Sequence, residues 1–365
     1  MIIPIFLMNR GCPHRCIYCN ERLTAGNHPA RVTEAAFAET VRAHLRSAPR
    51  KPGQMQIAFY GGTFTGMERE EQRRLLSMAQ PFLREGAVDG IRISTRPDGI
   101  DKEALDLFRT TGVKTVEIGA QSLHEGVLIE SHRGHTEADT VRALTLLKEN
   151  GFKTGIHLMA GLPGDSADRF AETIMKTIAL RPDMVRIHPT LVLRDTPLAQ
   201  AFHQGMYKPL TLPEATDLCK NALKALTSAG IPVIRLGLQT TRELEEPGAV
   251  VAGPFHQAFR SIVEAALFLE LATSLLLSAK QGNGVTSSGS AKTDRLTARF
   301  TVSPSDFSSF CGAGRRNIAF LQERFSSEEI RITSHPTVSR GTVILTHGNQ
   351  QLQADGAGRI TRLQG

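Results

Sequence analysis

Seven short apolar runs, separated by stretches with helical periodicity, constrain the fold of this 365-residue chain more than any other feature. The runs are rich in β-branched residues and nearly continuously apolar, which is typical of strands buried on both faces. They lie at residues 2–7, 55–60, 91–95, 113–118, 152–159, 183–188 and 232–237, the last of which closes or flanks the set. Alternation of strands and helices implies parallel strands joined by right-handed crossovers. The sequence therefore predicts an α/β fold, either a doubly wound sheet or a partial α/β barrel.

The stretch 136–150 shows how the intervening helices are marked. Thr136 with Asp139 resembles a capping box at the start of a helix, and Gly151 supplies a left-handed stop. Asp101 is the expected N-cap of another helix.

The pattern changes near Gly253. A long apolar helix or helix pair is predicted over 255–279, and the Gly/Ser-rich stretch 281–292 is predicted to be a flexible loop. A strand, a helix and two more strands follow. We therefore expect two domains: a barrel-like domain over 1–240 and a small C-terminal α+β domain over 241–365.

Composition narrows the class of protein. The chain is 41% hydrophobic and 22% charged, as in a globular protein with a sizeable core. No apolar run approaches eighteen residues, and the N-terminus lacks a basic segment and a cleavage site. We therefore expect a cytoplasmic protein with no membrane contact. The net charge of +7 suits an acidic partner, with nucleic acid as the leading candidate and a merely solvated basic surface as the alternative.

Three cysteines lie within eight positions, directly after the first predicted strand. Their spacing is Cys-x3-Cys-x2-Cys, and they are Cys12, Cys16 and Cys19. Thiolates are soft ligands that suit zinc or iron–sulfur clusters. A structural zinc ion would need a fourth ligand, and the options are His14, His28, Cys219 and Cys311. Alternatively, three thiolates hold three irons of a 4Fe–4S cluster and leave the fourth iron free, and the spacing favours this reading.

The cysteine motif, with Tyr18 in an aromatic position before the last cysteine, resembles the signature of the radical S-adenosylmethionine (SAM) superfamily. The resemblance implies a 4Fe–4S cluster whose open iron binds SAM. It also implies reductive cleavage of SAM to a 5′-deoxyadenosyl radical, with electrons from a flavodoxin- or ferredoxin-type donor. The fold implied is a partial (β/α)6 TIM-like barrel.

Several further motifs follow predicted strands, where a barrel would present them at one rim. The segment YGGTFTG resembles the Gly-Gly motif of the superfamily, which places Gly61, Gly62 and Thr63 at the methionyl amino group; a simple turn is the alternative. Arg133 is a candidate partner for the SAM carboxylate, or else a surface arginine at a helix start.

Other polar and apolar residues at strand ends complete the candidate cofactor site. Four of them have groups that could pair with ribose hydroxyls or merely satisfy buried backbone: Arg96, Glu117, Gln121 and Ser122. Two could pack on adenine: Met159 and Leu162. His188 could approach the substrate or be a hydrogen-bonded core residue. No catalytic residue is assigned.

The motifs from GGTF to RIHPTLVLRDTPL, taken in order, resemble the radical-SAM part of the catalytic subunit of Elongator over about residues 2–240. That resemblance implies tRNA as partner and its wobble uridine as substrate. The acetyltransferase domain of that family is not recognisable here: Ser309 stands where its motif has Gln or Arg. A small metabolite is therefore the alternative substrate. A non-catalytic, zinc-containing nucleic-acid-binding protein ranks below both, because 5% aromatic residues and no Trp make a poor stacking platform.

Overall fold

The computed structural model describes residues 1–26, 31–47, 55–238, 240–282, 296–326 and 328–363. Most of the predicted flexible loop, like His28, lies outside these residues. The chain forms two compact units, the first of residues 1–215 with 231–257 and the second of residues 216–230 with 258–365. The predicted domain division after residue 240 stays a prediction, because compactness does not measure independent folding.

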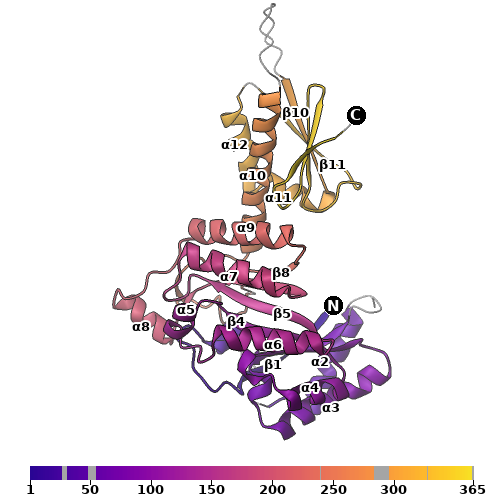
Figure 1. The fold of residues 1–365 in the computed structure, drawn as a ribbon, viewed down its shortest axis with the longest axis vertical. Coiled ribbons are helices and arrows are strands. Elements are labelled where there is room, and N and C mark those ends of the chain that lie inside the picture. The colour runs from indigo at the N-terminus through magenta and orange to yellow at the C-terminus, as the bar shows by residue number, and fades with distance from the viewer. Residues whose placement is uncertain (27–30, 48–54, 239, 283–295, 327, 364–365) are drawn as a thin grey trace, which may run out of the picture. The chain divides into compact units, whose positions relative to one another are not determined.

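The first unit is built on a seven-stranded parallel sheet with the order β1-β2-β3-β4-β5-β6-β8 (Figure 1). Its strands are β1 (Ile2–Arg10), β2 (Gln56–Gly62), β3 (Gly90–Thr95), β4 (Val113–Gln121), β5 (Lys153–Ala160), β6 (Met184–Pro189) and β8 (Val233–Leu236). All seven predicted strands are present, and the seventh flanks the sheet by pairing with β6.

Helices connect these strands, as parallel pairing requires. They are α1 (Glu21–Ala25), α2 (Glu34–Ser47), α3 (Arg69–Arg84), α4 (Lys102–Thr111), α5 (Glu125–Glu130), α6 (Glu137–Glu149), α7 (Ala167–Leu180) and α8 (Pro197–His203), with 3-10 turns η1 (Phe64–Gly66) and η2 (Pro97–Gly99). A small antiparallel pair is formed by β7 (Val192–Leu193) and β9 (Val250–Ala252). Helix α9 (Leu212–Ser228) runs from the first unit into the second.

The capping residues predicted from the sequence are found at the ends of two of these helices. A capping box of Thr136 and Asp139 starts α6, and Gly151 adopts the left-handed φ of 77° just beyond its end. The Asp101 side chain accepts a hydrogen bond from the backbone of Ala104 and caps α4.

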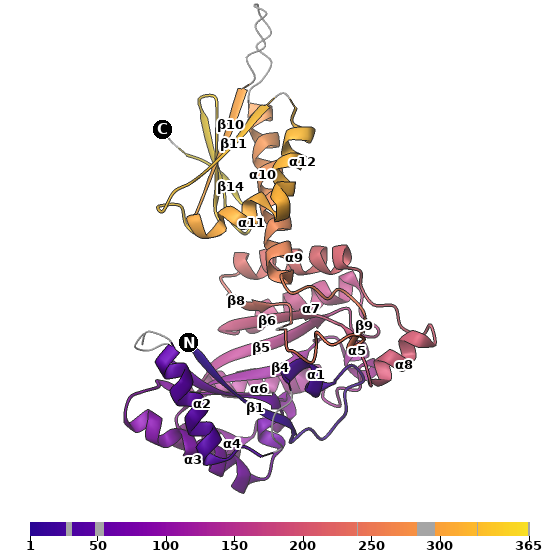
Figure 2. The ribbon, with the colours of Figure 1, turned by 180° about the vertical axis from the view of Figure 1, so that it is seen from behind.

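The two faces of the sheet differ in chemistry. The helix-covered face is apolar and includes a chain of aromatic rings with centroids 5.5 to 6.4 Å apart: Phe37, Phe59, Phe64, Phe108 and Phe152. The opposite face carries buried charges such as Arg92 and Glu117, which are 7% and 4% exposed. The strands are thus buried on both faces, as expected, but one face is polar. Figure 2 shows the sheet from behind, with β5, β6 and β8 toward the viewer.

The sheet curls around its polar face. Strands β2 and β6 are four places apart in the sheet order, which is about 19 Å in a flat sheet with neighbours about 4.8 Å apart. The Arg186 guanidinium on β6 nevertheless donates a 2.7 Å hydrogen bond to the Tyr60 hydroxyl on β2. Only a strongly curved sheet allows this contact, which confirms the predicted partial barrel. The seven strands form a half-barrel, and the polar face is its inner face. The sheet stays open between β1 and β8, which are not paired.

The second unit packs helices against one face of a five-stranded sheet with the order β11-β10-β12-β13-β14. The strands are β10 (Leu296–Val302), β11 (Glu328–Ser334), β12 (Val343–His347), β13 (Gln350–Ala354) and β14 (Ile360–Arg362). The helices are α10 (Phe259–Gly282), α11 (Phe307–Cys311) and α12 (Arg316–Arg324), with 3-10 turns η3 (Pro304–Asp306) and η4 (Ala313–Arg315). The predicted α+β character is confirmed. The polar strands β13 and β14 were not predicted, because QQLQA and ITR have little apolar signal.

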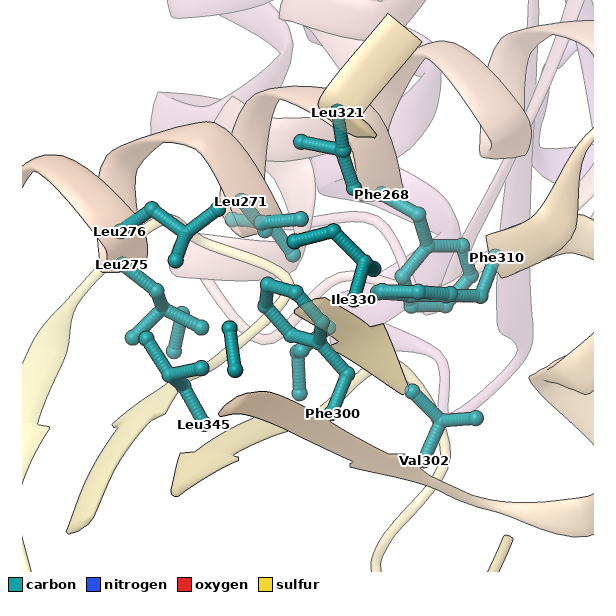
Figure 3. Close-up of a cluster of buried hydrophobic side chains, with 14 of the residues drawn as sticks. Phe268, Leu271, Leu275, Leu276, Phe300, Val302, Phe310, Leu321, Ile330 and Leu345 are labelled. Atoms are coloured by element: carbon teal, nitrogen blue, oxygen red, sulfur yellow. The ribbon is translucent and has the colours of Figure 1, made fainter. Parts of the chain in front are cut away.

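One helix in the described residues, α10, is long and apolar enough to cross a membrane by length and composition alone. A core helix passes the same test. Leu271, Leu275 and Leu276 of this helix pack with Phe300 and Leu345 of the sheet in a single buried cluster (Figure 3). The apolar character of α10 is therefore explained by the core of the second unit.

The core of the second unit gives a first prediction. Phe300 is fully buried, so Phe300→Ala should lower the free energy of unfolding by about 3–5 kcal/mol in a urea titration followed by circular dichroism. Phe320 on α12 is 40% exposed, and Phe320→Ala is the matched control, with a loss below about 1 kcal/mol. Equal losses in both variants would contradict the assigned core.

Candidate functional site

The three clustered cysteines lie on the loop between β1 and α1. Three hydrogen bonds tie the loop to distant segments. Two involve the loop backbone, Ile17 N to Ser131 O (3.4 Å) and Leu198 N to Ile17 O (2.8 Å), and one the Asn20 side chain, Nδ2 to Arg194 O (2.8 Å). Cys12 and Cys19 are exposed, and Cys16 is half-buried. Within the described residues, no three His, Cys, Asp or Glu side chains converge tightly enough to hold a single metal ion.

The structure brings the Gly-Gly turn against this cysteine loop. Thr63 N donates to Arg10 O at 2.9 Å, and the Thr63 hydroxyl lies 3.3 Å from the Cys12 sulfur. Gly62 has φ near 150°, and a Cβ atom there would lie 2.6 Å from Arg10 O. A Cβ atom on Gly66 would lie 1.9 Å from the carbonyl oxygen of Gly11. Only residues without side chains let the two loops approach this closely.

Arg133 joins a third segment to the cysteine loop. Its guanidinium is buried and donates hydrogen bonds to the Cys16 sulfur at 2.9 Å and the Tyr18 hydroxyl at 3.3 Å. A further hydrogen bond goes to the carbonyl of Gly119 on β4. Arg133 is therefore a fixed cation beside the cysteines.

Arg96 holds Arg133 in place. Arg96 is 4% exposed, forms a bidentate ion pair with Asp98 and donates to the backbone carbonyl of Arg133. Its contacts are with protein groups, so the structure gives it a positioning role. The hydrogen bond to the Arg133 carbonyl agrees with the alternative interpretation, that Arg96 satisfies a buried backbone group. A contact of Arg96 with the ribose stays a prediction.

Gln121 lies near Arg133, whereas Ser122 points elsewhere. Gln121 has a left-handed φ of 64°, and both its amide atoms and an Arg133 nitrogen lie within 3.6 Å of the Cβ position of Gly119. The Ser122 hydroxyl contacts Thr173 on α7 and accepts from a backbone amide. Gln121 is thus placed beside the cation, and Ser122 is engaged with the helix layer.

The two residues predicted to pack on adenine lie in different places at the end of β5. Met159 lies opposite His188 in the register of β5 and β6. Leu162 is 2% exposed, in the turn after β5. Their contact with adenine stays a prediction.

A charged network on the inner face of the sheet was missed from sequence. Glu117 receives a hydrogen bond from Arg92, pairs with Arg186 Nε at 3.0 Å and accepts from the Tyr60 hydroxyl at 3.0 Å. The Arg186 guanidinium also lies over the Tyr60 ring, 4.8 Å from its centroid. A signal was present in the sequence: Arg92 and Arg186 each interrupt an apolar strand at its third residue. Glu117 is therefore tied to protein groups.

Three histidines of this unit are held neutral by their surroundings. Burial, followed by the positive charge of Arg133, lowers the pKa of His135 to about 3. Burial, followed by Arg186, lowers the pKa of His157 to about 3. Burial, followed by His157, lowers the pKa of His188 well below its usual value.

These shifts predict that acid destabilises the folded chain. Below about pH 6.5 the unfolded chain protonates its histidines, whereas the folded chain keeps these three neutral until far lower pH. The contribution of these three neutral histidines to the free energy of unfolding is therefore fully present above pH 6.5 and is lost as the pH falls toward 3. The free energy of unfolding should fall between pH 7 and pH 5 by up to about 1.4 kcal/mol per pH unit for each histidine. Urea titrations at several pH values measure this slope.

His157→Gln should reduce this slope, because one of the three histidines with a lowered pKa is removed. The exposed His203 gives the control variant His203→Gln, which should keep the wild-type slope. A slope unchanged by His157→Gln would contradict the neutral state of that residue.

Comparisons with known proteins agree with this architecture. The family model described as the Radical SAM superfamily matches residues 6–177, and the model described as the Radical_SAM C-terminal domain matches residues 182–268. The solved structure of an archaeal Methanocaldococcus infernus Elp3 with an N-terminal deletion covers 97% of this chain and 78% of its own length. Its TM-score is 0.53 at 19% identity, so it supports the fold.

Two curated relatives share parts of the sequence. The tRNA uridine(34) acetyltransferase of Methanocaldococcus infernus is 26% identical over 259 residues, which cover 60% of this chain and 48% of that protein. Elongator complex protein 3 of Homo sapiens is 36% identical over 137 residues, 37% of this chain and 25% of that protein. The chain therefore spans about half the length, or less, of these relatives. The resemblance to Elongator over the radical-SAM region is confirmed, and the chain is an enzyme of the radical SAM superfamily.

Proposed function

We propose that this enzyme holds a 4Fe–4S cluster on Cys12, Cys16 and Cys19 and cleaves SAM reductively. One observation carries the proposal: the cysteine loop, the Gly-Gly turn and Arg133 meet at one rim of the half-barrel. Thr63 contacts Cys12, and Arg133 donates to Cys16. The Arg133 guanidinium therefore places a positive charge beside a sulfur that would ligate the cluster.

The donor set fits a cluster better than a single zinc ion. A zinc site brings four ligands to one point. The described residues contain no such convergent group. A cube distributes three cysteines over three irons, so their sulfurs need not meet at one point. Cys219 and Cys311 are buried free thiols of the second unit, which suits small apolar residues.

The loops around the cysteines supply groups for SAM. We assign the backbone of Gly61, Gly62 and Thr63 to the methionyl amino group and the Arg133 guanidinium to the carboxylate. A cluster held by Cys12, Cys16 and Cys19 would supply one electron from the external donor for the reductive cleavage of SAM. Tyr18 and Arg96 hold Arg133 in position. We assign Gln121 to the ribose and Met159 with Leu162 to the adenine. The contacts of Glu117 and Ser122 give them supporting roles.

We further propose tRNA as the substrate, at the wobble uridine. Support comes from the names of the relatives, one a tRNA uridine(34) acetyltransferase, and from the net charge of +7. Modification of tRNA, with a flavodoxin- or ferredoxin-type electron donor, implies action in the cytoplasm. A small metabolite remains the second candidate, because the chain spans only 48% of that relative.

The cluster proposal predicts the outcome of replacing one cysteine. After anaerobic reconstitution with iron and sulfide, the wild-type protein should show visible charge-transfer absorption and form 5′-deoxyadenosine from SAM and dithionite. Cys16→Ala should abolish both, because two thiolates do not support the cube. The matched control, Cys219→Ala, should retain both. Equal iron and sulfide content in Cys16→Ala and wild type would contradict the assignment.

The tRNA proposal predicts salt-dependent binding and a modified nucleoside. Affinity for bulk tRNA should fall at least about tenfold between 50 and 200 mM salt, because phosphate contacts release counterions. Anaerobic incubation of the reconstituted enzyme with tRNA, SAM and dithionite, followed by nucleoside mass spectrometry, should reveal an altered wobble uridine that the Cys16→Ala variant does not produce. An unaltered nucleoside profile, together with salt-independent or absent tRNA binding, would favour a small metabolite.

A further inference from the structure

Two histidines on the inner face of the half-barrel, one half-buried and one buried, have no role in the binding of the cluster or SAM proposed above. His157 on β5 and His188 on β6 meet edge to face, with ring centroids 4.3 Å apart and planes at 65°. The Nε2 atom of each is buried and has no hydrogen-bond partner among the described residues. His188 is only 9% exposed. A buried polar atom without a partner is destabilising, so a bound group that pairs with both Nε2 atoms would stabilise this face.

The same face carries an excess of positive charge. Arg186 lies opposite His157 on one side and opposite Arg235 of β8 on the other. Like charges directly opposite on neighbouring strands are destabilising. Glu117 is the carboxylate paired with Arg92 and Arg186. No ion pair of Arg235 with a carboxylate occurs among the described residues, and burial followed by Arg186 lowers the pKa of Arg235.

A bound anion would pair with the two unpartnered Nε2 atoms and would also neutralise part of the positive charge on this face. An oxyanion accepts hydrogen bonds from several donors at once and pairs bidentately with arginine. A neutral imidazole with its proton on Nε2 is a donor suited to such a group. Arg186 is already tied to Glu117 and Tyr60, so Arg235 is the guanidinium left for the ligand.

We propose that His157, His188 and Arg235 bind an oxyanionic group of the substrate, a phosphate or a carboxylate, on the inner face of the half-barrel. The site is built from residues other than those assigned to SAM. It adjoins them, because Met159 lies opposite His188 in the strand register. That the anion belongs to the substrate rests on the proposed function, whereas the binding of an anion does not.

Titration of the full chain, labelled with 15N-histidine, tests the site. Inorganic phosphate, acetate and methionine are added separately at constant ionic strength, and the ring nitrogen resonances are assigned with His157→Gln and His188→Gln. We expect saturable shifts of both residues with phosphate or with acetate. A stronger response to phosphate indicates a phosphorylated substrate such as RNA, and a stronger response to acetate indicates a carboxylate-bearing metabolite.

Variants at Arg235 give the control. Arg235→Gln should weaken the binding at least tenfold, and Arg235→Lys, which keeps the charge, should restore most of it. The exposed Arg299 of the second unit offers a matched change in net charge, and Arg299→Gln should bind as wild type. Unfolding midpoints in urea verify that the variants are folded.

Three results would overturn the proposal: no saturable shift with either anion, equal weakening by Arg299→Gln, or a tighter response to methionine than to acetate. The last would assign the site to the carboxylate of SAM. Neither iron nor SAM is present in this titration. A failure to form 5′-deoxyadenosine therefore leaves its outcome unaffected, and the two proposals fail separately.

Discussion

The ion-paired cluster around Glu117 is the interaction on which the interior of the half-barrel depends. One buried carboxylate on β4 binds arginines from β3 and β6 and a tyrosine from β2, so it ties together strands that are distant in the sheet. Removing one partner from such a network leaves an uncompensated buried charge, which is strongly destabilising. The curvature of the sheet and the polar character of its inner face are therefore coupled. A flat sheet could not bring Tyr60 to Arg186.

The same curvature explains why the candidate site lies at one rim. Parallel strands place their carboxyl ends on one edge, and the loops that follow β1, β2 and the segment before α6 contact each other there. Glycines at 62 and 66 allow the close approach, and buried Arg96 holds the backbone of Arg133. Rigid support of this kind keeps the cysteine loop in place although two of its cysteines are exposed.

The second unit has a different physical basis. Its long apolar helix is stabilised by packing on a five-stranded sheet, and the opposite sheet face carries threonine, arginine and glutamine side chains. Its sheet order places β10 between a parallel and an antiparallel neighbour. The chain spans about half the length, or less, of the relatives described above. That this chain shares the tRNA-modifying activity of those relatives is therefore a proposal.

The amino-acid sequence by itself determined the class of fold, the seven strands and the capped helices, because these depend on local patterns of apolar and capping residues. It also marked the cysteine loop, the Gly-Gly turn and Arg133, since each is a short motif after a strand. It did not show that Glu117 and Arg96 are engaged by protein partners, or that His157, His188 and Arg235 share one face. Those facts depend on contacts between residues up to 126 positions apart, as for Tyr60 and Arg186. Only the tertiary structure decides them, because the curvature of the sheet selects which inward-facing side chains meet.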